Sequence, residues 1–323
     1  MISVTSLLSP VEHDLQLLIS NLTSLVEAQH PILGAAAEHL FSAGGKRIRP
    51  AIVLLVSRAT MKGEDLTPRH RRLAEITEMI HTASLVHDDV VDEAELRRQV
   101  PTVNNLFGNR IAVLAGDFLF AQSSWYLANL DNLEVVKLLS EVIRDFAEGE
   151  IQQGLSCFDT TLTLEKYLEK SYYKTASLIA NSAKAAVVLS DGNKEVAEEI
   201  YNYGRNLGLA FQIVDDILDF TSPTEVLGKP AGSDLASGNL TAPVLFAMEE
   251  KPYLQVLIDR EFSEDGDLEE ALELVNQSNG IDKARSLASY HSDLALRSLD
   301  CLSTSTATES LAELTSYVIS RVK

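Results

Sequence analysis

Residues 67–92 read TPRHRRLAEITEMIHTASLVHDDVVD, a stretch that predicts one long helix ending in a cluster of acids. Thr67 and Pro68 are typical of a helix start, because threonine caps free amide groups and proline suits the first turn. The apolar positions that recur at helical spacing include Leu73, Ile76 and Ile80. At about 1.5 Å per residue, Asp88 lies roughly 30 Å from the start of this helix. The stretch therefore predicts carboxylates at the far end of a long, largely buried helix.

The same helical spacing runs through most of the chain, and the alternation that marks β-strands is nearly absent. The apolar run at residues 51–56 could be a buried strand by composition, but it follows Pro50 and continues helically, so a helix is predicted. Residues 222–239 form the one long break and hold several glycines and prolines. This segment is either a plain surface loop or a lid over an anion, and Lys229 and Asp234 favour the lid. We predict an all-α protein with a single domain over residues 1–323.

The composition is that of an acidic globular protein. The 323 residues are 46% hydrophobic and 23% charged, and 27 lysines and arginines against 47 acids give a net charge of −20. Such a charge argues against nucleic acid as a partner. Cys157 and Cys301 have no metal-type spacing. The longest charge-free apolar stretch near the middle, residues 118–130, is shorter than the ~20 residues that span a bilayer. With no targeting peptide visible, we predict a cytoplasmic protein without a transmembrane segment.

The pattern D-D-x-x-D occurs twice, at Asp88–Asp92 and at Asp215–Asp219. On a helix, the first and last acids of each copy are four residues apart and lie on one face. Like charges there repel unless a cation joins them, and hard carboxylate ligands suit Mg²⁺ that also binds water and substrate phosphate. Two solvated helix faces are the plain alternative, but apolar neighbours place both motifs on largely buried helices. The pattern favours magnesium ligands at Asp88, Asp92, Asp215 and Asp219.

Basic residues complement these acids and predict an anion-binding site. Residues 44–50, GGKRIRP, place two glycines before Lys46, Arg47 and Arg49, where backbone amides and guanidinium groups can approach a diphosphate. This loop is not a Walker A motif, because Leu40 and Arg47 occupy positions where that motif needs glycine and a hydroxyl residue. The other candidates are Arg97, Arg98, Lys174 and His81. Each alone could be an ordinary surface cation or core histidine.

Taken in order, these motifs resemble the trans-prenyl diphosphate synthase family. The resemblance covers about residues 35–245 and rests on residues 44–50, the two acidic motifs, Arg97-Arg98, Gly116-Asp117, Lys174-Thr175, Phe211-Gln212, Gly228-Lys229 and residues 232–235. It implies the isoprenoid synthase fold, a helical bundle around a central cavity, and a homodimer with three Mg²⁺ between the acidic motifs. It also implies a prenyltransferase that joins isopentenyl diphosphate head to tail to an allylic diphosphate.

The resemblance assigns roles to single residues. Isopentenyl diphosphate would be held by Lys46, Arg49, His81 and Arg98. The allylic diphosphate would be bound by Arg97, Lys174, Thr175, Gln212 and Lys229. Catalysis would depend on Asp88, Asp92, Asp215, Lys174 and Lys229. Asp89 and Asp216 are expected to bind lysine or to order water. The chain departs from the family at Asn239, where many relatives have the lysine of Gly-Lys-x-Thr, so binding is expected to depend more on Lys229.

The residues one turn before the first acidic motif predict a long product. In short-chain relatives a bulky side chain closes the cavity there, whereas this chain has Ala83 and Ser84. Each added isoprene unit buries five carbons, about 4 kcal/mol, so an open tunnel favours extension. We expect a product of forty to fifty carbons, with forty-five favoured, as a precursor of quinone side chains. Both residues could also be small for helix packing alone.

Other functions stay open at this point. A farnesyl or geranylgeranyl diphosphate synthase would keep the chemistry with a shorter cavity. A class I terpene cyclase also uses an acidic motif with Mg²⁺, but two such motifs and a second diphosphate pocket at Lys46 and Arg49 argue against it. A non-catalytic regulatory subunit could lose either motif, yet both are intact. A structural scaffold would leave the basic residues without explanation.

Overall fold

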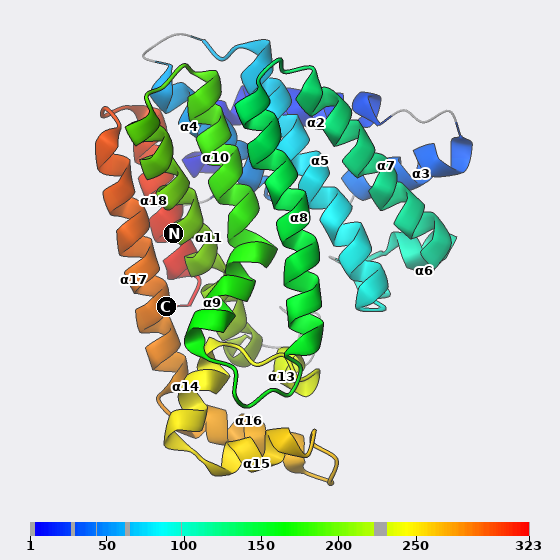
Figure 1. Ribbon diagram of the computed structural model, residues 1–323, viewed down its shortest axis with the longest axis vertical. Helices are drawn as coiled ribbons and strands as arrows, with labels where there is room; N and C mark the ends of the chain where they lie inside the picture. Colours follow the sequence, from blue (N-terminus) through cyan, green and yellow to red (C-terminus); the bar gives the residue numbers. More distant parts are fainter. Residues whose placement is uncertain are drawn as a thin grey trace. The chain divides into compact units, whose positions relative to one another are not determined.

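The computed structural model describes residues 4–26, 30–42, 44–61, 65–97, 99–222 and 231–322, and these residues are almost entirely helical (Figure 1). The helices up to the middle of the chain are α1 Val4–Leu7, α2 Glu12–Leu25, α3 Pro31–Ser42, α4 Ile48–Thr60, α5 Pro68–Val91, α6 Val103–Phe107, α7 Asn109–Ala128 and α8 Leu133–Leu155. The later helices are α9 Leu164–Ser171, α10 Ser177–Leu189, α11 Lys194–Thr221, α13 Ser233–Ala236, α14 Ala242–Glu250, α15 Tyr253–Asp259, α16 Asp267–Gln277, α17 Gly280–Ser298 and α18 Thr306–Ser320. The all-α prediction is confirmed.

Short non-α elements join some of these helices. They are the 3₁₀ turns η1 Ser9–Val11 and η3 Leu299–Cys301, the π-helical turn η2 Tyr172–Ala176, and the strands β1 Leu96–Arg97 and β2 Val100–Pro101. The two strands pair antiparallel, with Leu96 opposite Pro101 and Arg97 opposite Val100. Neither the hairpin nor the π-helical turn was expected from the sequence.

Helix α5 begins as residues 67–92 predict. Thr67 is its N-cap, and Thr67 and His70 form a reciprocal capping box in which the Thr67 amide donates to Nδ1 of His70 at 3.3 Å. The stretch that could have been a strand, residues 51–56, is helical within α4. All six of its residues are buried, because a helix in the centre of a packed core needs no polar face.

By its internal packing the chain divides into two compact units. Unit 1 comprises Met1–Ile143, Leu178–Tyr201 and Leu299–Leu314, and unit 2 comprises Arg144–Ser177, Asn202–Ser298 and Thr315–Lys323. Helices α8, α11 and α18 contribute residues to both units. The first acidic motif belongs to unit 1 and the second to unit 2. The single domain predicted over residues 1–323 stays a prediction.

In unit 1, α5 packs against α7 and α4, and α5 and α7 run side by side in Figure 1. Gly116 of α7 allows close approach, since a Cβ atom there would lie 2.2 Å from Nε2 of His87. A buried carboxylate on α2 adds ionic links: Asp14 accepts hydrogen bonds from Arg58 of α4 at 2.8 Å and from Arg71 of α5 at 2.7 Å. These contacts fix the helix that carries the first acidic motif.

In unit 2, α14 packs against α17, and α15 against α16. The turn η2 lies directly against α11, because a Cβ atom on Gly208 would be 2.5 Å from Cα of Ala176. Tyr167 of α9 and Tyr203 of α11 are among the largest fully buried side chains. This packing holds Lys174 and Thr175, which lie in η2, beside the helix that carries the second acidic motif.

Among the described helices, α7 alone is long and apolar enough to cross a bilayer by length and composition, with a mean hydropathy of 1.2. One third of this helix segment is buried in unit 1, including Ala112, Ala115 and Leu119. The opposite face exposes Val113, Leu114 and Trp125. These three residues define the exposed apolar face of α7.

Candidate active site

The first acidic motif ends α5 in unit 1. Asp88 is half-buried and Asp92, the C-cap residue, is exposed, and the Asp92 amide donates to the Asp88 carbonyl at 2.8 Å. Because one helical turn separates the two carboxylates, they can share one cation. The structure thus brings this predicted pair together at the accessible end of the helix.

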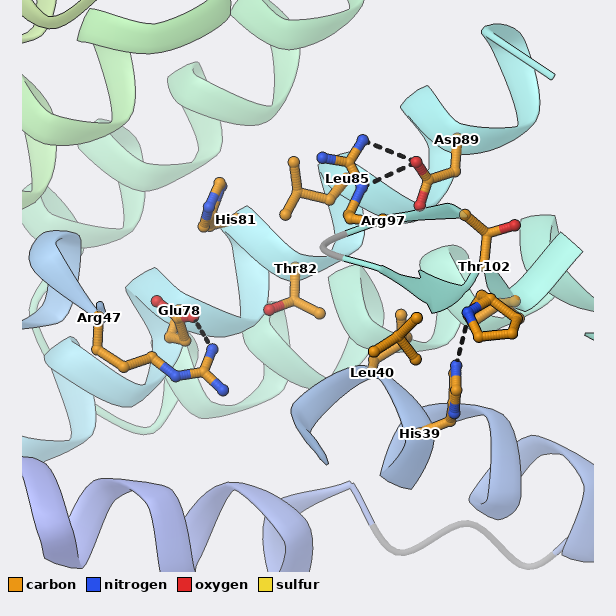
Figure 2. A pocket seen from close by; sticks show the side chains of 13 residues that line it. His39, Leu40, Arg47, Glu78, His81, Thr82, Leu85, Asp89, Arg97 and Thr102 are labelled. Atoms are coloured by element: carbon orange, nitrogen blue, oxygen red, sulfur yellow. Dashed lines mark hydrogen bonds and ion pairs between the residues drawn. The ribbon is translucent and has the colours of Figure 1, made fainter. Parts of the chain in front are cut away.

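Asp89 differs from its neighbours because it is buried, with 4% of the residue exposed. Its Oδ1 accepts a hydrogen bond from Nε of Arg97 at 2.8 Å and lies 2.7 Å from Nη2 of the same side chain (Figure 2). A charge-assisted contact through two nitrogens restricts the guanidinium group. Asp89 therefore positions Arg97, so its cationic partner is an arginine where a lysine was expected, and the ordering of water by Asp89 stays a prediction. Arg98, the next residue, lies outside the described residues.

The arginines at and just after the start of α4 have different partners. Arg47 has a left-handed backbone, with φ of 49°, and its guanidinium group pairs with buried Glu78. Arg49 points elsewhere, and its Nη1 lies 3.1 Å from Nε2 of His81. Lys46 is exposed. The structure therefore brings Arg49 and His81 together, as predicted for a diphosphate site, while Arg47 is committed to a buried ion pair.

A pocket in unit 1 opens among these groups, as Figure 2 shows. Its charged lining includes Arg47, Glu78, Asp89 and Arg97, beside the imidazole of His81, and its apolar lining includes Leu40, Leu85 and Val103. On the α3 side, Nε2 of His39 lies 2.8 Å from the carbonyl oxygen of Pro101. A pocket lined by both charged and apolar side chains suits a ligand with an anionic head and a short hydrocarbon part.

The second acidic motif lies near the end of α11 in unit 2. Asp215 is half-buried and pairs with Arg321, whose Nη1 lies 2.8 Å from Asp215 Oδ1. Asp219 is 2% exposed, and its two oxygens accept hydrogen bonds from the Ser233 hydroxyl at 3.0 Å and the Asp234 amide at 3.2 Å. Asp219 therefore anchors the start of α13, and its role as a metal ligand stays a prediction.

Asp216 is the buried centre of a hydrogen-bond chain. It accepts from the Tyr167 hydroxyl at 2.5 Å and from Nε2 of Gln212 at 2.8 Å, and Thr175 donates to Oε1 of Gln212 at 2.6 Å. Burial raises the pKa of Asp216 to about 7. The structure thus brings together Thr175 and Gln212, both predicted to bind the allylic diphosphate. Asp216 orients Gln212, and the expectation that it binds lysine or orders water stays a prediction.

Lys174 occupies the π-helical turn η2 beside this chain. Its Nζ donates to Oε1 of Gln153 at 3.0 Å and lies 3.0 Å from Oε1 of Glu150. A π-helical turn widens the backbone and commonly marks a functional site. Lys229, the other lysine predicted to bind the allylic diphosphate, lies outside the described residues.

Sequence reasoning missed three side chains near the second motif: Tyr167, Lys170 and Arg321. Tyr167 and Lys170 lie on the amphipathic helix α9, where a tyrosine is typical of a core and a lysine of a surface. Arg321 follows α18, far from Asp215 in sequence. One indirect indication of Lys170 was present in the sequence. Asn239 stands where many relatives have a lysine, so another cation could be expected nearby.

The two residues expected to govern product length lie one turn before Asp88. Ala83 is fully buried, and half-buried Ser84 donates a hydrogen bond to the carbonyl of His81 at 2.9 Å. Neither side chain projects bulk from α5. On α7, Phe120 meets the ring of His87 edge to face, with 5.7 Å between ring centroids.

Within the described residues, no three acidic, histidine or cysteine side chains gather closely enough to enclose a metal ion. Each acidic motif instead offers carboxylates on one helical turn. Mg²⁺ is commonly held by one or two carboxylates, with water and substrate phosphate completing its shell. The carboxylates of Asp88 and Asp92 therefore fit Mg²⁺ that arrives with a diphosphate, whereas at the second motif Asp215 pairs with Arg321 and both oxygens of Asp219 accept hydrogen bonds.

Comparisons with known proteins place the chain in a family. The family model described as Polyprenyl synthetase matches residues 30–275. The chain is 73% identical over 322 residues to a prenyl transferase from Synechocystis sp., covering 100% of each chain. It is 56% identical over 324 aligned positions to solanesyl-diphosphate synthase 2, chloroplastic, from Oryza sativa subsp. japonica, covering 99% of this chain and 80% of that one.

A solved structure gives the same answer for the fold. The model matches a polyprenyl synthase from Caulobacter crescentus, complexed with calcium and isoprenyl diphosphate, with a TM-score of 0.91 and 35% identity, covering 99% of this chain and 98% of that one. The predicted isoprenoid synthase fold and the predicted prenyltransferase activity are confirmed. The chain belongs to the polyprenyl synthetase family.

Proposed function

We propose that the protein is a long-chain trans-polyprenyl diphosphate synthase. It adds isopentenyl units to an allylic diphosphate until the chain reaches about forty-five carbons, a length used in quinone side chains. The observation that carries this proposal is that half-buried Ser84 is the side chain α5 presents one turn before Asp88, with the small Ala83 packed in the core beside it. The rice relative's name supports the length, since a solanesyl group has forty-five carbons.

The reaction starts with cleavage of the bond between the allylic carbon and its diphosphate oxygen. The bonding electrons leave with the diphosphate, so the growing negative charge needs cations in a water-poor site. Mg²⁺ bound at Asp88, Asp92, Asp215 and Asp219, three ions per site by the resemblance, would neutralise most of this charge. The calcium and isoprenyl diphosphate in the Caulobacter structure support a divalent cation beside the substrate.

The chain's own residues complete the allylic site. Arg97, restrained by Asp89, and Lys174 offer charge-assisted hydrogen bonds to the leaving diphosphate. Gln212 is oriented by Asp216 and Thr175 and offers polar contacts. Lys229 is assigned the same role. Since hydrogen bonds already orient Arg97 in unit 1 and Gln212 in unit 2, each needs little reorganisation as the bond breaks.

The second substrate is isopentenyl diphosphate, which Arg49 and His81 hold together with Lys46 and Arg98. Its alkene attacks the allylic cation, a new carbon–carbon bond forms, and a proton leaves the adjacent carbon to restore a double bond. No side chain is assigned as the base, and the released diphosphate accepts the proton. The product is again an allylic diphosphate, so the cycle repeats until the tunnel ends.

A second copy of the chain is proposed to cover the exposed apolar face of α7. Val113, Leu114 and Trp125 lie on one side of this helix, and each is at least 40% exposed. An exposed apolar patch on a helix that is only one-third buried is typical of an oligomer interface. Light scattering after size exclusion should give a dimer mass for the wild type and a monomer mass for Trp125→Glu. A monomeric wild type would contradict the homodimer.

The chain's location stays proposed as cytoplasmic, although the rice relative is named chloroplastic. Cell fractionation would test it, and recovery of the protein in a detergent-soluble membrane fraction would contradict it.

The function is tested by elongation of labelled isopentenyl diphosphate by the purified protein. Geranyl, farnesyl and geranylgeranyl diphosphate serve in turn as primers, with Mg²⁺ or with EDTA, and products are resolved by length. We expect magnesium-dependent products of forty to fifty carbons, and none from Asp88→Asn or Asp215→Asn. Products of fifteen or twenty carbons would refute the long chain. No elongation with any primer would refute the synthase.

A further inference from the structure

Lys170 is a buried cation that the roles above do not use. It lies on α9 in unit 2 with 6% of the residue exposed, and its Nζ donates a 2.6 Å hydrogen bond to Oδ1 of Asn239. Among the described side chains, Lys170 forms no ion pair. A buried ammonium group whose hydrogen-bond partner is a neutral amide has an incompletely balanced charge, which is unfavourable unless an anion binds.

Asp216 does not supply that anion. Both of its oxygens already accept hydrogen bonds, from the Tyr167 hydroxyl and from Nε2 of Gln212. Burial also lowers the pKa of Lys170, although the nearby Asp216 carboxyl opposes this shift. The charge of Lys170 is therefore only partly balanced within unit 2.

The same pocket contains further groups that suit an anion. Lys170, Lys174, Asn239 and Thr241 line it together with Gln153 and Tyr167. Thr241 is 2% exposed, and its Oγ1 has no hydrogen-bond partner in the part of the chain that the structure describes. Two lysines facing one pocket repel each other until an anion joins them. A buried hydroxyl without a partner is an independent sign that a ligand is expected there.

The location of this pocket identifies the class of anion. It shares Gln212 and Asp216 with a neighbouring pocket of about 300 Å³ that is lined by Asp215, Asp219, Asp234 and Arg321. An anion held by Lys170 and Lys174 would therefore lie beside the second acidic motif. The backbone of Asn239 is itself fixed, because its amide donates to the Asp234 carbonyl at 2.8 Å.

We propose that Lys170, held in place by Asn239, binds the diphosphate of the allylic substrate together with Thr241 and takes the place of the lysine that position 239 lacks. The assignment rests on the proposed function. It explains why Asn239 is tolerated: an asparagine there orients a cation delivered from α9 instead of carrying one. Lys170 and Asn239 thus form an exchangeable pair in which either position can supply the charge.

Binding of inorganic diphosphate in the presence of Mg²⁺, measured by titration calorimetry, tests this pair without requiring elongation. We expect Lys170→Asn to weaken binding by at least tenfold. The exchange variant Lys170→Asn with Asn239→Lys should recover binding to within about threefold of the wild type, since the ammonium group returns to the same pocket. Lys166→Met, an exposed lysine one turn earlier on α9, is the matched control and should change binding less than twofold.

Asn239→Asp provides a test that leaves Lys170 in place. Its carboxylate would pair with Lys170 and neutralise the ammonium charge, so diphosphate binding should again fall at least tenfold. If Lys170→Asn does not fold, this variant alone tests whether Lys170 binds the diphosphate. Binding within twofold of the wild type by Lys170→Asn or by Asn239→Asp, or an exchange variant no better than Lys170→Asn, would overturn the assignment. Failure of the proposed function would be seen separately, as absence of elongation by the wild type.

Discussion

The hydroxyl of Tyr167 donates a 2.5 Å hydrogen bond to Asp216, and neither residue is more than 3% exposed. A phenol on α9 thus satisfies a carboxyl group on α11, next to the acids proposed to hold metal. Because the remaining oxygen accepts from Gln212, this single bond also fixes a side chain proposed to contact substrate. Tyr167 is therefore a positioning residue for the allylic site.

Replacement of Tyr167 by phenylalanine should lower the free energy of unfolding by about 1–3 kcal/mol, because a buried acceptor loses its donor. The pKa of Asp216 should rise further, since the Tyr167 hydrogen bond holds it down. Chemical denaturation at neutral pH measures the first effect. The control is Tyr173→Phe, whose hydroxyl lies 3.4 Å from Glu169 at an exposed site, and it should change stability by less than about 0.5 kcal/mol. Equal effects of the two changes would contradict the role of Tyr167.

Asp89→Asn tests whether Asp89 positions Arg97. Asparagine keeps the shape but loses the charge, so the guanidinium group loses a charge-assisted contact at 2.7 to 2.8 Å. The KM for the allylic diphosphate should rise about tenfold, equivalent to about 1.4 kcal/mol. Steady-state kinetics would measure it, with the exposed Glu95→Gln as a control that leaves KM unchanged. An unaltered KM in Asp89→Asn would show that Arg97 does not depend on Asp89.

His70 makes the stability of the protein depend on pH. It is fully buried, with Nε2 3.0 Å from the Ser190 hydroxyl, and burial lowers its pKa from 6.5 to about 4. Between these values the unfolded chain binds more protons than the folded chain, so stability rises with pH from about 4 to 6.5. The full contribution of this group is about 3 kcal/mol, present above pH 6.5 and lost as pH falls toward 4.

Urea unfolding at a series of pH values checks this linkage. His70→Gln should reduce the rise in the free energy of unfolding over this range by about half, because burial also lowers the pKa of His291 to about 4, whereas the exposed His13→Gln should leave the rise as in the wild type. A wild-type slope that survives in His70→Gln would assign the linkage to another group.

Much of the helical framework could be predicted because its signals are local. Thr67, Pro68 and the apolar spacing after them define α5, and Pro50 correctly indicated that residues 51–56 belong to a helix. The hairpin of β1 and β2 could not be predicted, since it lacks an Asn-Gly or Asp-Gly turn and Gln99 takes a positive φ of 65°. The π-helical turn η2 depends on packing of Ala176 against Gly208, which are far apart in sequence.

The candidate site shows the same limit. Its residue types could be predicted, but not which of two neighbouring arginines forms a buried ion pair and which faces the candidate site. Arg47 and Arg49 look alike in sequence, yet a left-handed backbone at Arg47 directs it to Glu78 and leaves Arg49 beside His81. Lys170 resembled a surface lysine because its burial depends on Asn239, which follows much later in the chain. Such distinctions arise from tertiary contacts.

Product length from Ser84→Phe tests the central claim most directly, that small residues before Asp88 leave a tunnel for a long chain. Ser84 is the better site than Ala83, because Ala83 is fully buried and a phenylalanine there would overpack the core. Chromatography of dephosphorylated products should show a shift from forty to fifty carbons in the wild type to twenty or fewer in Ser84→Phe, with Ser84→Ala unchanged. Long products from Ser84→Phe, at wild-type length, would contradict the account.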